Sequence, residues 1–224
     1  MSKIITANRL IVLGRNSKVW QLLHKSNLLV DLPVVAIGHK ELATFTFLPG
    51  DNVWVFSYSH SVSQNSVLLK YLAKQKKISV VYVSSASTNV TSITRCYKYP
   101  TVKQLALEDA VRLCNAQIIN IGWFYSTLTD LPPGSTAATS VYELAIAIRN
   151  SKHFASQFFN LFHMVDRPFN RRFEKIIYQW YGRLIAGCGH YPCLLRPLDL
   201  ALRILGMRWY GYLYLSNRLW SSTI

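Results

Sequence analysis

Short apolar runs alternate with segments of helical periodicity along the first 150 residues, and this alternation limits what the chain can fold into. The runs with the length and composition of buried strands are 9–13, 33–38, 52–57, 78–84 and 117–124. The clearest helical patterns between and after them are 62–77, 100–114 and 140–149. Because the runs are apolar almost throughout, both faces of each strand should be buried. The sequence therefore predicts an α/β fold with a doubly wound parallel sheet.

A candidate for chemistry lies between Ile78 and Lys103. Its apolar run ends in a cluster of small hydroxyl residues that includes Ser84 and Ser85, and Tyr99 follows fourteen residues after Ser85. On a helix, Tyr99 and Lys103 would share one face, where the ammonium would lower the pKa of the phenol. A hydroxyl at the strand end, from Ser85 or else Ser84, would then share a substrate oxygen with Tyr99. The stretch thus predicts proton transfer between a carbonyl and an alcohol.

With these features, residues 8–150 resemble the short-chain dehydrogenase/reductase superfamily, and in particular its extended branch of nucleotide-sugar epimerases and dehydratases. The resemblance rests on the hydroxyl cluster, the Tyr99/Lys103 pair and the Ile-Gly-Trp-Phe-Tyr run that ends at Tyr125. It implies a Rossmann-like fold with an NAD(P) cofactor. It also implies that Tyr99 is the general acid/base, that Ser85 contacts the substrate oxygen, and that Lys103 tunes the tyrosine and binds the cofactor ribose.

The turn after the first strand departs from the G-x-x-G-x-x-G pattern of this family, because its three positions are Gly14, Ser17 and Trp20. Gly14 keeps the tight turn, and a small hydroxyl at Ser17 could still meet a phosphate. Trp20 would be tolerated if it points into the core. Arg15 and Asn16 in the same turn are further candidates for cofactor phosphate contact, with solvent-exposed loop residues as the alternative interpretation.

The second strand ends in Gly38-His39-Lys40, without the acidic residue that would hold ribose hydroxyls. A cationic His39/Lys40 pair would suit a 2′-phosphate and favours NADP over NAD, although two surface charges in a loop explain the pair equally simply. Strand ends of a parallel sheet share the edge at which ligands bind. The candidate contacts on that edge are Gly14, Gly38, Ser57 and Ser85.

The composition changes near residue 150, so we expect a Rossmann-like domain of residues 1–150 followed by a basic, aromatic-rich helical appendage, 151–224. From residue 149 onward, eleven basic residues face three acidic ones, and arginines alternate with Trp and Tyr. Such a composition suits an anionic membrane surface. The leucines at helical spacing there are Leu195, Leu198, Leu202 and Leu205. An oligomer interface or a self-packed subdomain is the alternative, and the absence of a recognisable module argues against nucleic acid.

The cysteines indicate free thiols in a reducing compartment, because Cys96, Cys114, Cys188 and Cys193 lack metal-ligand spacing, and we expect no bound metal. The first residues resemble no signal peptide, and no apolar run reaches the roughly 18 residues of a transmembrane helix. His153, His163 and His190 are isolated, as are Asp130 and Asp166, so no hydrolase motif is present. We expect a cytoplasmic protein, with attachment to the inner face of the membrane as an alternative.

Two functions follow from these patterns. The first is an NAD(P)-dependent oxidoreductase, epimerase or dehydratase that acts on a nucleotide- or lipid-linked sugar in surface polysaccharide biosynthesis, as the resemblance implies. The second is a catalytically degenerate protein of the same fold that serves as a membrane-associated binding or scaffolding subunit, as the altered glycine positions suggest. Neither hypothesis fixes the oligomeric state, and a homo-oligomer is compatible with both.

Overall fold

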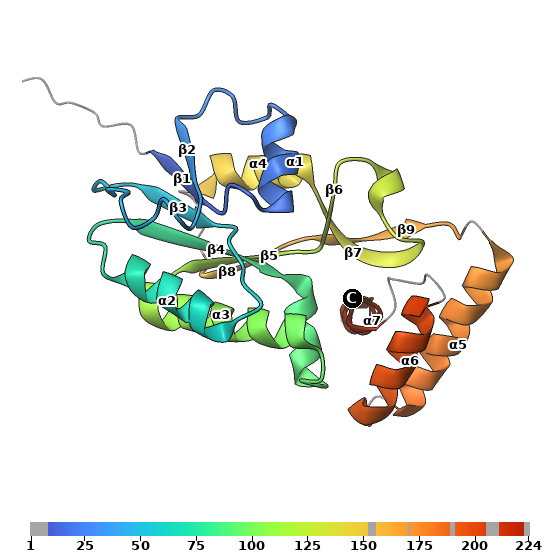
Figure 1. Ribbon diagram of the computed structural model, residues 1–224. Helices are drawn as coiled ribbons and strands as arrows, with labels where there is room; N and C mark the ends of the chain where they lie inside the picture. The colour runs from blue at the N-terminus through green and yellow to red at the C-terminus, as the bar shows by residue number, and fades with distance from the viewer. Residues whose placement is uncertain (1–8, 152–155, 170, 189–190, 205–210, 222–224) are drawn as a thin grey trace, which may run out of the picture. The chain divides into compact units, whose positions relative to one another are not determined.

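The computed structural model describes residues 9–151, 156–169, 171–188, 191–204 and 211–221 (Figure 1). Its main sheet has six strands in the order β2-β1-β3-β4-β5-β8. These are β1 (Leu10–Leu13), β2 (Val34–Ile37), β3 (Asn52–Val55), β4 (Ser79–Ser85), β5 (Gln117–Ile121) and β8 (Phe158–Leu161). β1 pairs in parallel with both β2 and β3, and β3 pairs in parallel with β4. The predicted Rossmann-like α/β fold is confirmed.

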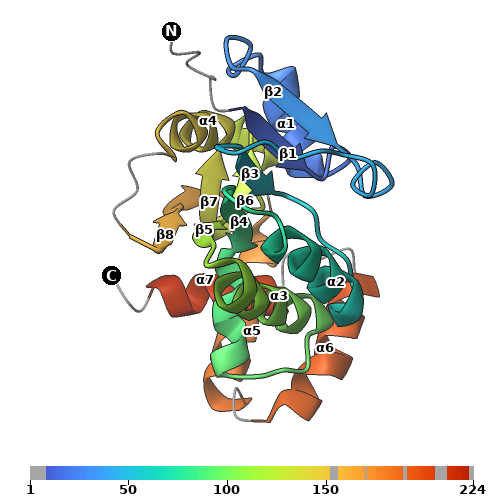
Figure 2. The ribbon, with the colours of Figure 1, turned by 90° about the vertical axis from the view of Figure 1, so that its left-hand side faces the viewer.

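Helices cover both faces of this sheet, with α1 and α4 on one side and α2 and α3 on the other (Figures 1 and 2). Their bounds are α1 (Lys18–Lys25), α2 (Val62–Ala73), α3 (Lys98–Cys114) and α4 (Val141–Arg149). Leu69 and Leu72 of α2 and Ala110 of α3 pack against Ile11 and Val53 in one buried cluster. These apolar residues of α2 and α3 therefore face the strands, as their spacing predicts.

The strand order reverses beside β1, because β2 lies on one side of it and β3 on the other. In α/β sheets of this kind, ligands bind beyond the carboxyl ends of the strands where the order reverses. Here those ends are Gly14, which follows β1, and Ser57, which follows β3 by two residues. The sheet thus gives the predicted nucleotide-binding turn its expected position.

A second sheet contains β6 (Trp123–Tyr125), β7 (Gly134–Ser140) and β9 (His163–Arg167) in the order β6-β7-β9. β6 and β7 are parallel, whereas β7 and β9 are antiparallel. The sequence did not predict β7, because its Gly-Ser-Thr-Ala-Ala-Thr-Ser residues carry no apolar run and follow a Pro-Pro break. β8 and β9 also form where helices were expected, since cross-strand pairing decided the conformation of this aromatic segment.

The chain forms two compact units, each discontinuous in sequence. The first comprises Met1–Val83, Ala106–Ile119 and Leu144–Phe159, and the second comprises Ser84–Leu105, Asn120–Glu143 and Asn160–Ile224. The second unit includes the 3₁₀ helix η1 (Ala86–Ser92) and the helices α5 (Arg172–Cys188), α6 (Pro192–Ile204) and α7 (Tyr212–Ser221). The predicted assignment of cofactor binding to 1–150 and of membrane or partner binding to 151–224 stays a prediction.

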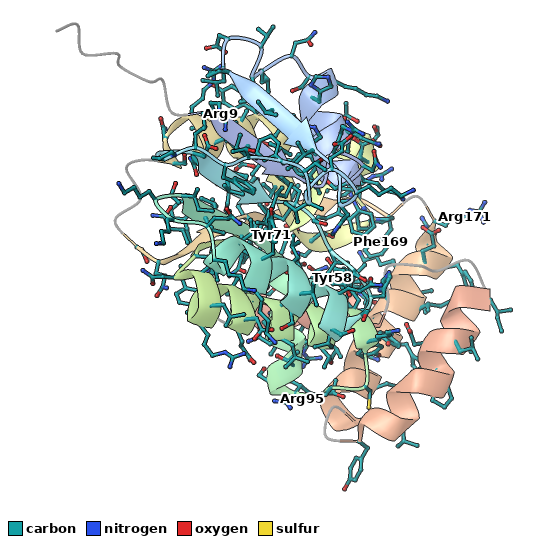
Figure 3. All side chains as sticks on the ribbon, turned by 60° about the vertical axis from the view of Figure 1, so that its left-hand side comes forward. Arg9, Tyr58, Tyr71, Arg95, Phe169 and Arg171 are labelled. Carbon is teal, nitrogen blue, oxygen red and sulfur yellow. The ribbon has the colours of Figure 1, made fainter. Side chains whose placement is uncertain are left out.

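The second unit has a buried core of its own, which we call the tyrosine cluster. It consists of Val90, Tyr97, Tyr181, Tyr214 and Leu215, with Ile177, Tyr178, Leu198 and Tyr212 packed against them. Phe169, which precedes α5, packs its ring on Tyr178 at a centroid distance of 5.1 Å (Figure 3). Many of the aromatic residues in the C-terminal region are therefore core residues.

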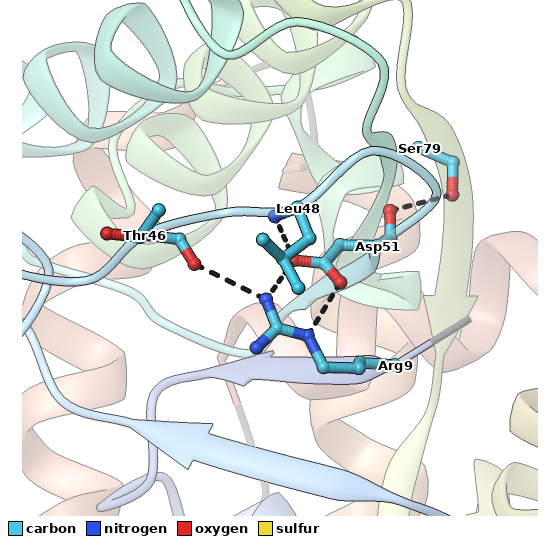
Figure 4. A network of polar contacts seen from close by, with 5 residues as sticks. All are labelled: Arg9, Thr46, Leu48, Asp51 and Ser79. Atoms are coloured by element: carbon cyan, nitrogen blue, oxygen red, sulfur yellow. Dashed lines mark hydrogen bonds and ion pairs between the residues drawn. The ribbon is translucent and has the colours of Figure 1, made fainter. Parts of the chain in front are cut away.

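Arg9 and Asp51 anchor the long connection between β2 and β3 to the start of β1 (Figure 4). The Arg9 guanidinium donates to both carboxylate oxygens of buried Asp51, at 2.9 and 2.7 Å, and to the Thr46 carbonyl at 3.3 Å. The Leu48 N–H donates to the same carboxylate at 2.8 Å, and the Ser79 N–H donates to the Asp51 carbonyl at 3.0 Å. This network, rather than a helix or a strand, holds the connection in place.

No helix within the described ranges is long and apolar enough to cross a membrane. Those ranges also hold no group of three His, Cys, Asp or Glu side chains arranged for a metal ion. Cys96 and Cys114 are free, partly buried thiols. The predictions for His153 and His190, and for the side chains of Cys188 and Cys193, lie outside the described residues.

Candidate functional site

The hydroxyl cluster lies where β4 passes into η1. Ser85 caps η1, because its Oγ accepts a hydrogen bond from the Ser87 N–H at 3.3 Å and lies 2.9 Å from Ser87 Oγ. Thr88 Oγ1 donates to the Ser85 carbonyl at 2.8 Å. Successive residues of a strand point to opposite faces, so Ser84 and Ser85 diverge. Ser84 is 1% exposed, and its hydroxyl has no hydrogen-bond partner among the described residues.

Tyr99 lies in the first turn of α3, and its side chain is hydrogen-bonded to that of Ser85. Its ring stacks on Tyr212 of α7, with centroids 5.6 Å apart and an interplanar angle of 30°. Burial raises the pKa of the Tyr99 phenol above its ordinary value of 10, and the hydrogen bond with Ser85 lowers it by less. The expected lowering of this pKa by Lys103 stays a prediction, because desolvation of the phenolate dominates the shift in the protein alone.

Lys103 follows Tyr99 by one turn of α3 and is buried, with 5% of its surface exposed. Burial lowers the pKa of its ammonium to about 7, because a charged amine loses its hydration there. Near neutral pH the amine can thus take either protonation state. Ser85, Tyr99 and Lys103 all belong to the second unit.

α7 contributes neighbours to this site that the sequence analysis did not predict. Ser216 Oγ and Trp220 Nε1 each donate to the Ala86 carbonyl at 3.1 Å, next to the Ser85 cap. Asn89 Nδ2 donates to the Ser216 carbonyl at 3.3 Å. These residues are more than a hundred positions apart in the sequence, and their aromatic and arginine-rich surroundings favoured a membrane interpretation. No local signal could have revealed them.

The nucleotide-binding candidates belong to the first unit, where Gly14 forms the tight turn after β1. Its φ is +106°, and a Cβ at this position would come within 2.8 Å of the Ser57 backbone nitrogen. The Gly14 and Arg15 N–H groups both donate to the Ile37 carbonyl, at 3.0 and 3.2 Å. The turn therefore requires glycine both for its backbone conformation and for the close approach of two strand ends.

The other two positions of the glycine pattern are accommodated in different ways. Ser17 is the N-cap of α1, and its Oγ accepts a hydrogen bond from the Trp20 N–H at 3.1 Å. Trp20 points into the core, where it is 4% exposed and its ring lies 6.0 Å from that of Phe56. The core therefore accommodates the bulky side chain.

Glu41 is a residue of this region that the sequence analysis missed. Its Oε2 accepts a hydrogen bond from the Gly38 N–H at 2.9 Å, and its Oε1 lies 2.9 Å from Arg15 Nη2. The Gly38 hydrogen bond, with a smaller contribution from Arg15, holds the pKa of the Glu41 carboxyl below its ordinary value. The carboxylate belongs to the end of β2 although it comes three residues after Gly38, because the chain turns back there.

The remaining candidates are distributed around the same strand ends. His39 Nε2 contacts Ser57 Oγ, whereas the side chains of Lys40 and Asn16 are exposed. Gly14, His39 and Ser57 line a cavity of about 10 Å³, which is room for about one water molecule. A larger cavity of about 430 Å³ lies along α1 and β2, with Arg15 and Trp20 among its lining residues.

The sheet order, the glycine turn at its reversal point and the Ser85–Tyr99 contact together define a Rossmann-like protein with candidate sites at its strand ends. No family profile matches the chain, and no curated protein sequence matches it. Solved structures with a similar fold include the UDP-N-acetylglucosamine 4-epimerase of Bacillus cereus, at 13% identity and a TM-score of 0.54. That match covers 79% of this chain and 86% of the epimerase.

Two further solved structures show the same likeness. The dTDP-4-dehydrorhamnose reductase of Bacillus anthracis, in complex with NADP, is 13% identical with a TM-score of 0.54, covering 78% of this chain and 81% of that one. MoeE5, in complex with UDP-glucuronic acid and NAD, is 13% identical with a TM-score of 0.52, covering 70% and 78%. At such identities the likeness shows the fold that this chain shares with NAD-dependent epimerases, dehydratases and reductases.

Proposed function

We propose that the protein is an NAD(P)-dependent oxidoreductase, epimerase or dehydratase that acts on a nucleotide- or lipid-linked sugar, in surface polysaccharide biosynthesis. The observation that carries the proposal is the hydrogen bond between Ser85 and Tyr99, with the amine of Lys103 buried one helical turn further on. The proteins of similar fold that bind or act on UDP- and dTDP-linked sugars support the choice of substrate class.

In this proposal Tyr99 gives a proton to the substrate oxygen, or takes one from it, at its phenol oxygen. Ser85, whose Oγ is oriented by the Ser87 N–H, donates a second hydrogen bond to the same oxygen. Protonated Lys103 would stabilise the phenolate through its charge. The bound nicotinamide would supply the hydride transfer.

The first unit offers residues that fit such a cofactor. The Gly14 and Arg15 N–H groups donate to the Ile37 carbonyl, so contact with a diphosphate would come from the exposed side chains of Arg15 and Asn16 in this turn. The Glu41 carboxylate would accept hydrogen bonds from ribose hydroxyls, which favours NAD. The positive charge of Lys40, next to His39, favours NADP instead.

Titration calorimetry with NADH and NADPH, followed by sugar-nucleotide turnover, tests the proposal. We expect micromolar binding of at least one cofactor, and we expect Tyr99→Phe to reduce turnover by about 10²-fold or more without changing cofactor affinity. Tyr142→Phe, at a side chain that is 63% exposed, is the matched control. Unchanged turnover in Tyr99→Phe would refute the mechanism.

A non-catalytic function is the second candidate, and two observations favour it. The His39–Ser57 contact closes the strand ends around a cavity of about 10 Å³, and the Ser17 hydroxyl is used as a helix cap. A degenerate protein of this kind would be a binding or scaffolding subunit, attached to the membrane. The absence of binding heat with either cofactor, in a folded sample, would support this candidate and count against the enzyme.

A further inference from the structure

We propose that the outer surfaces of α5 and α6 bind a membrane surface that contains anionic lipid. The starting observation is a concentration of large apolar side chains that are exposed on these two helices. On α5 they are Phe173, Ile176 and Trp180, which are 62%, 63% and 51% exposed. On α6 they are Leu194, Leu200 and Ile204, which are 58%, 61% and 78% exposed.

The two sets lie on the outward sides of their helices. Ile177, Tyr178 and Tyr181 of α5 and Leu198 of α6 pack into the tyrosine cluster. On α5 the exposed residues recur at spacings of three and four, which places them on one side of the helix. On α6 a spacing of four joins Leu200 and Ile204, and exposed Pro197 and Ala201 connect them to Leu194. We call the exposed apolar residues of the two helices the α5 stripe and the α6 stripe.

The exposed residues of α6 differ from the set of leucines that the helical spacing predicts. Leu198 is an inward residue that contacts the tyrosine cluster, so it cannot belong to an exposed stripe. The side chains of Leu195, Leu202 and Leu205 lie outside the described residues. On α6, the exposed positions among those described are all apolar, with Pro197 and Ala201 beside the three residues of the α6 stripe.

A row of cations borders the α5 stripe. Arg172, Lys175 and Arg183 are exposed and recur at spacings of three and eight residues, which places them along one edge of the stripe. Among the described side chains of α5 and α6, none of the exposed ones is a carboxylate: Glu174 is partly buried, and Asp199 is 6% exposed. Arg171 adds a further exposed cation just before α5 (Figure 3).

Charge complementarity favours an anionic membrane over a second copy of the chain as the partner of this surface. A second copy of the chain would bring the same cations against one another, whereas lipid phosphates and anionic headgroups would pair with them. Trp180 and the apolar stripe residues would enter the boundary between headgroups and acyl chains, as amphipathic interfacial helices do. Because neither helix, as described, is long and apolar enough to cross the bilayer, both would lie along its surface.

Vesicle co-sedimentation of the full chain tests this surface. Folded protein should pellet with vesicles of phosphatidylcholine and phosphatidylglycerol, and much less with phosphatidylcholine alone. We expect Ile176→Glu and Ile204→Glu each to weaken binding by about tenfold or more, since a charge would replace a buried apolar group. The double variant Arg172→Glu/Lys175→Glu should lose at least about fivefold per charge.

The matched controls lie on α2, in the first unit. Val67→Glu replaces a side chain that is 66% exposed, and Lys70→Glu reverses an exposed cation, so both should bind vesicles like the wild type. Circular dichroism verifies that each variant is folded. Failure of the folded wild type to pellet with the anionic vesicles overturns the proposal, as does an equal loss in the α2 controls. A dimer that Ile204→Glu dissociates, with no vesicle binding, would assign the surface to a second copy instead.

Discussion

Lys103 places an amine in the interior of the second unit, where its charged form is disfavoured. Its pKa of about 7 lies below the ordinary value of 10.5, so between these values the unfolded chain binds more protons than the folded one. The free energy of unfolding should therefore rise with pH across this window. The full destabilisation by the buried charge is present only below about pH 7, where Lys103 is protonated in the folded state. Such a lowered pKa is compatible with the proton transfer that we propose for this site.

We accordingly expect Lys103→Met to stabilise the chain more at pH 6 than at pH 9. The gain should shrink by up to about 1.4 kcal/mol per pH unit above 7, because the lysine loses its charge in the folded state first. Urea unfolding at several pH values measures this difference. Lys70→Met, at an exposed position of α2, serves as the control and should show no such trend. A stabilisation by Lys103→Met that does not vary with pH would contradict the lowered pKa of Lys103.

Gly14 offers a second test at the scale of one residue. Alanine there meets both a positive φ and a contact of 2.8 Å with Ser57 N, so Gly14→Ala should lower the free energy of unfolding by about 2 kcal/mol or more. Gly38→Ala is the matched control, because its Cβ would meet only Glu41 Oε2, at 3.9 Å. Thermal or urea unfolding distinguishes them, and equal losses would argue against strain at the turn.

At the residue scale, the sequence could identify candidate site residues only where they belong to a local sequence pattern. Ser85, Tyr99 and Lys103 were named because a strand end and a four-residue spacing sit close together in the chain. Glu41 was missed because a loop folds its carboxylate back to the Gly38 N–H, and Tyr212 because its contact with Tyr99 depends on tertiary packing.

At the scale of elements, hydrophobic runs predicted β1 to β4 and the helices around them, since burial on both faces leaves a strong signal. The run 117–124, predicted as one strand, is divided between β5 of the main sheet and β6 of the second sheet. β7 gave no such signal, because its small residues are held by pairing with β6 and β9 rather than by apolar character. The connection between β2 and β3 carries no regular apolar pattern either. Its anchor is the Arg9–Asp51 ion pair, whose partners are 42 residues apart.

Asp51→Asn tests that anchor. Burial raises the pKa of the Asp51 carboxyl, but the hydrogen bonds from Arg9 and the Leu48 N–H outweigh it, and the pKa is lowered overall. The ion pair therefore stabilises the fold above the ordinary pKa, and this stabilisation is lost as the pH falls through the lower, folded value. We expect the free energy of unfolding to fall by about 1–3 kcal/mol at pH 7, and this loss to diminish below about pH 4.

Asp109→Asn is the control for Asp51→Asn. Asp109 pairs with exposed Arg112 three residues on, and such pairs contribute only about 0.3–0.5 kcal/mol. Urea unfolding of both variants across the acid range provides the comparison. Similar losses in the two variants would show that the Arg9–Asp51 network does not anchor the connection.

At the scale of the whole molecule, each compact unit has its own buried core. The first unit is centred on the cluster that includes Ile11, Val53 and Leu69, and the second on the tyrosine cluster. The sequence suggested a boundary at residue 150, because composition changes there. It could not show that 84–105 and 120–143 join the C-terminal helices, since this depends on contacts such as those of α7 with η1.

Separate cores predict separate responses to mutation. Leu215 and Leu69 are each 1% exposed, one in the tyrosine cluster and one in the core of the first unit. Replacing either by alanine should cost about 2–5 kcal/mol through lost burial and a residual cavity. Hydrogen exchange followed by mass spectrometry should show that Leu215→Ala mainly exposes the amides of η1 and α7, and that Leu69→Ala mainly exposes those of β1 and α2. Each variant is the control for the other, because both remove the same side chain from a fully buried position. If both variants reduced protection equally throughout the chain, the two cores would have to unfold as one cooperative structure.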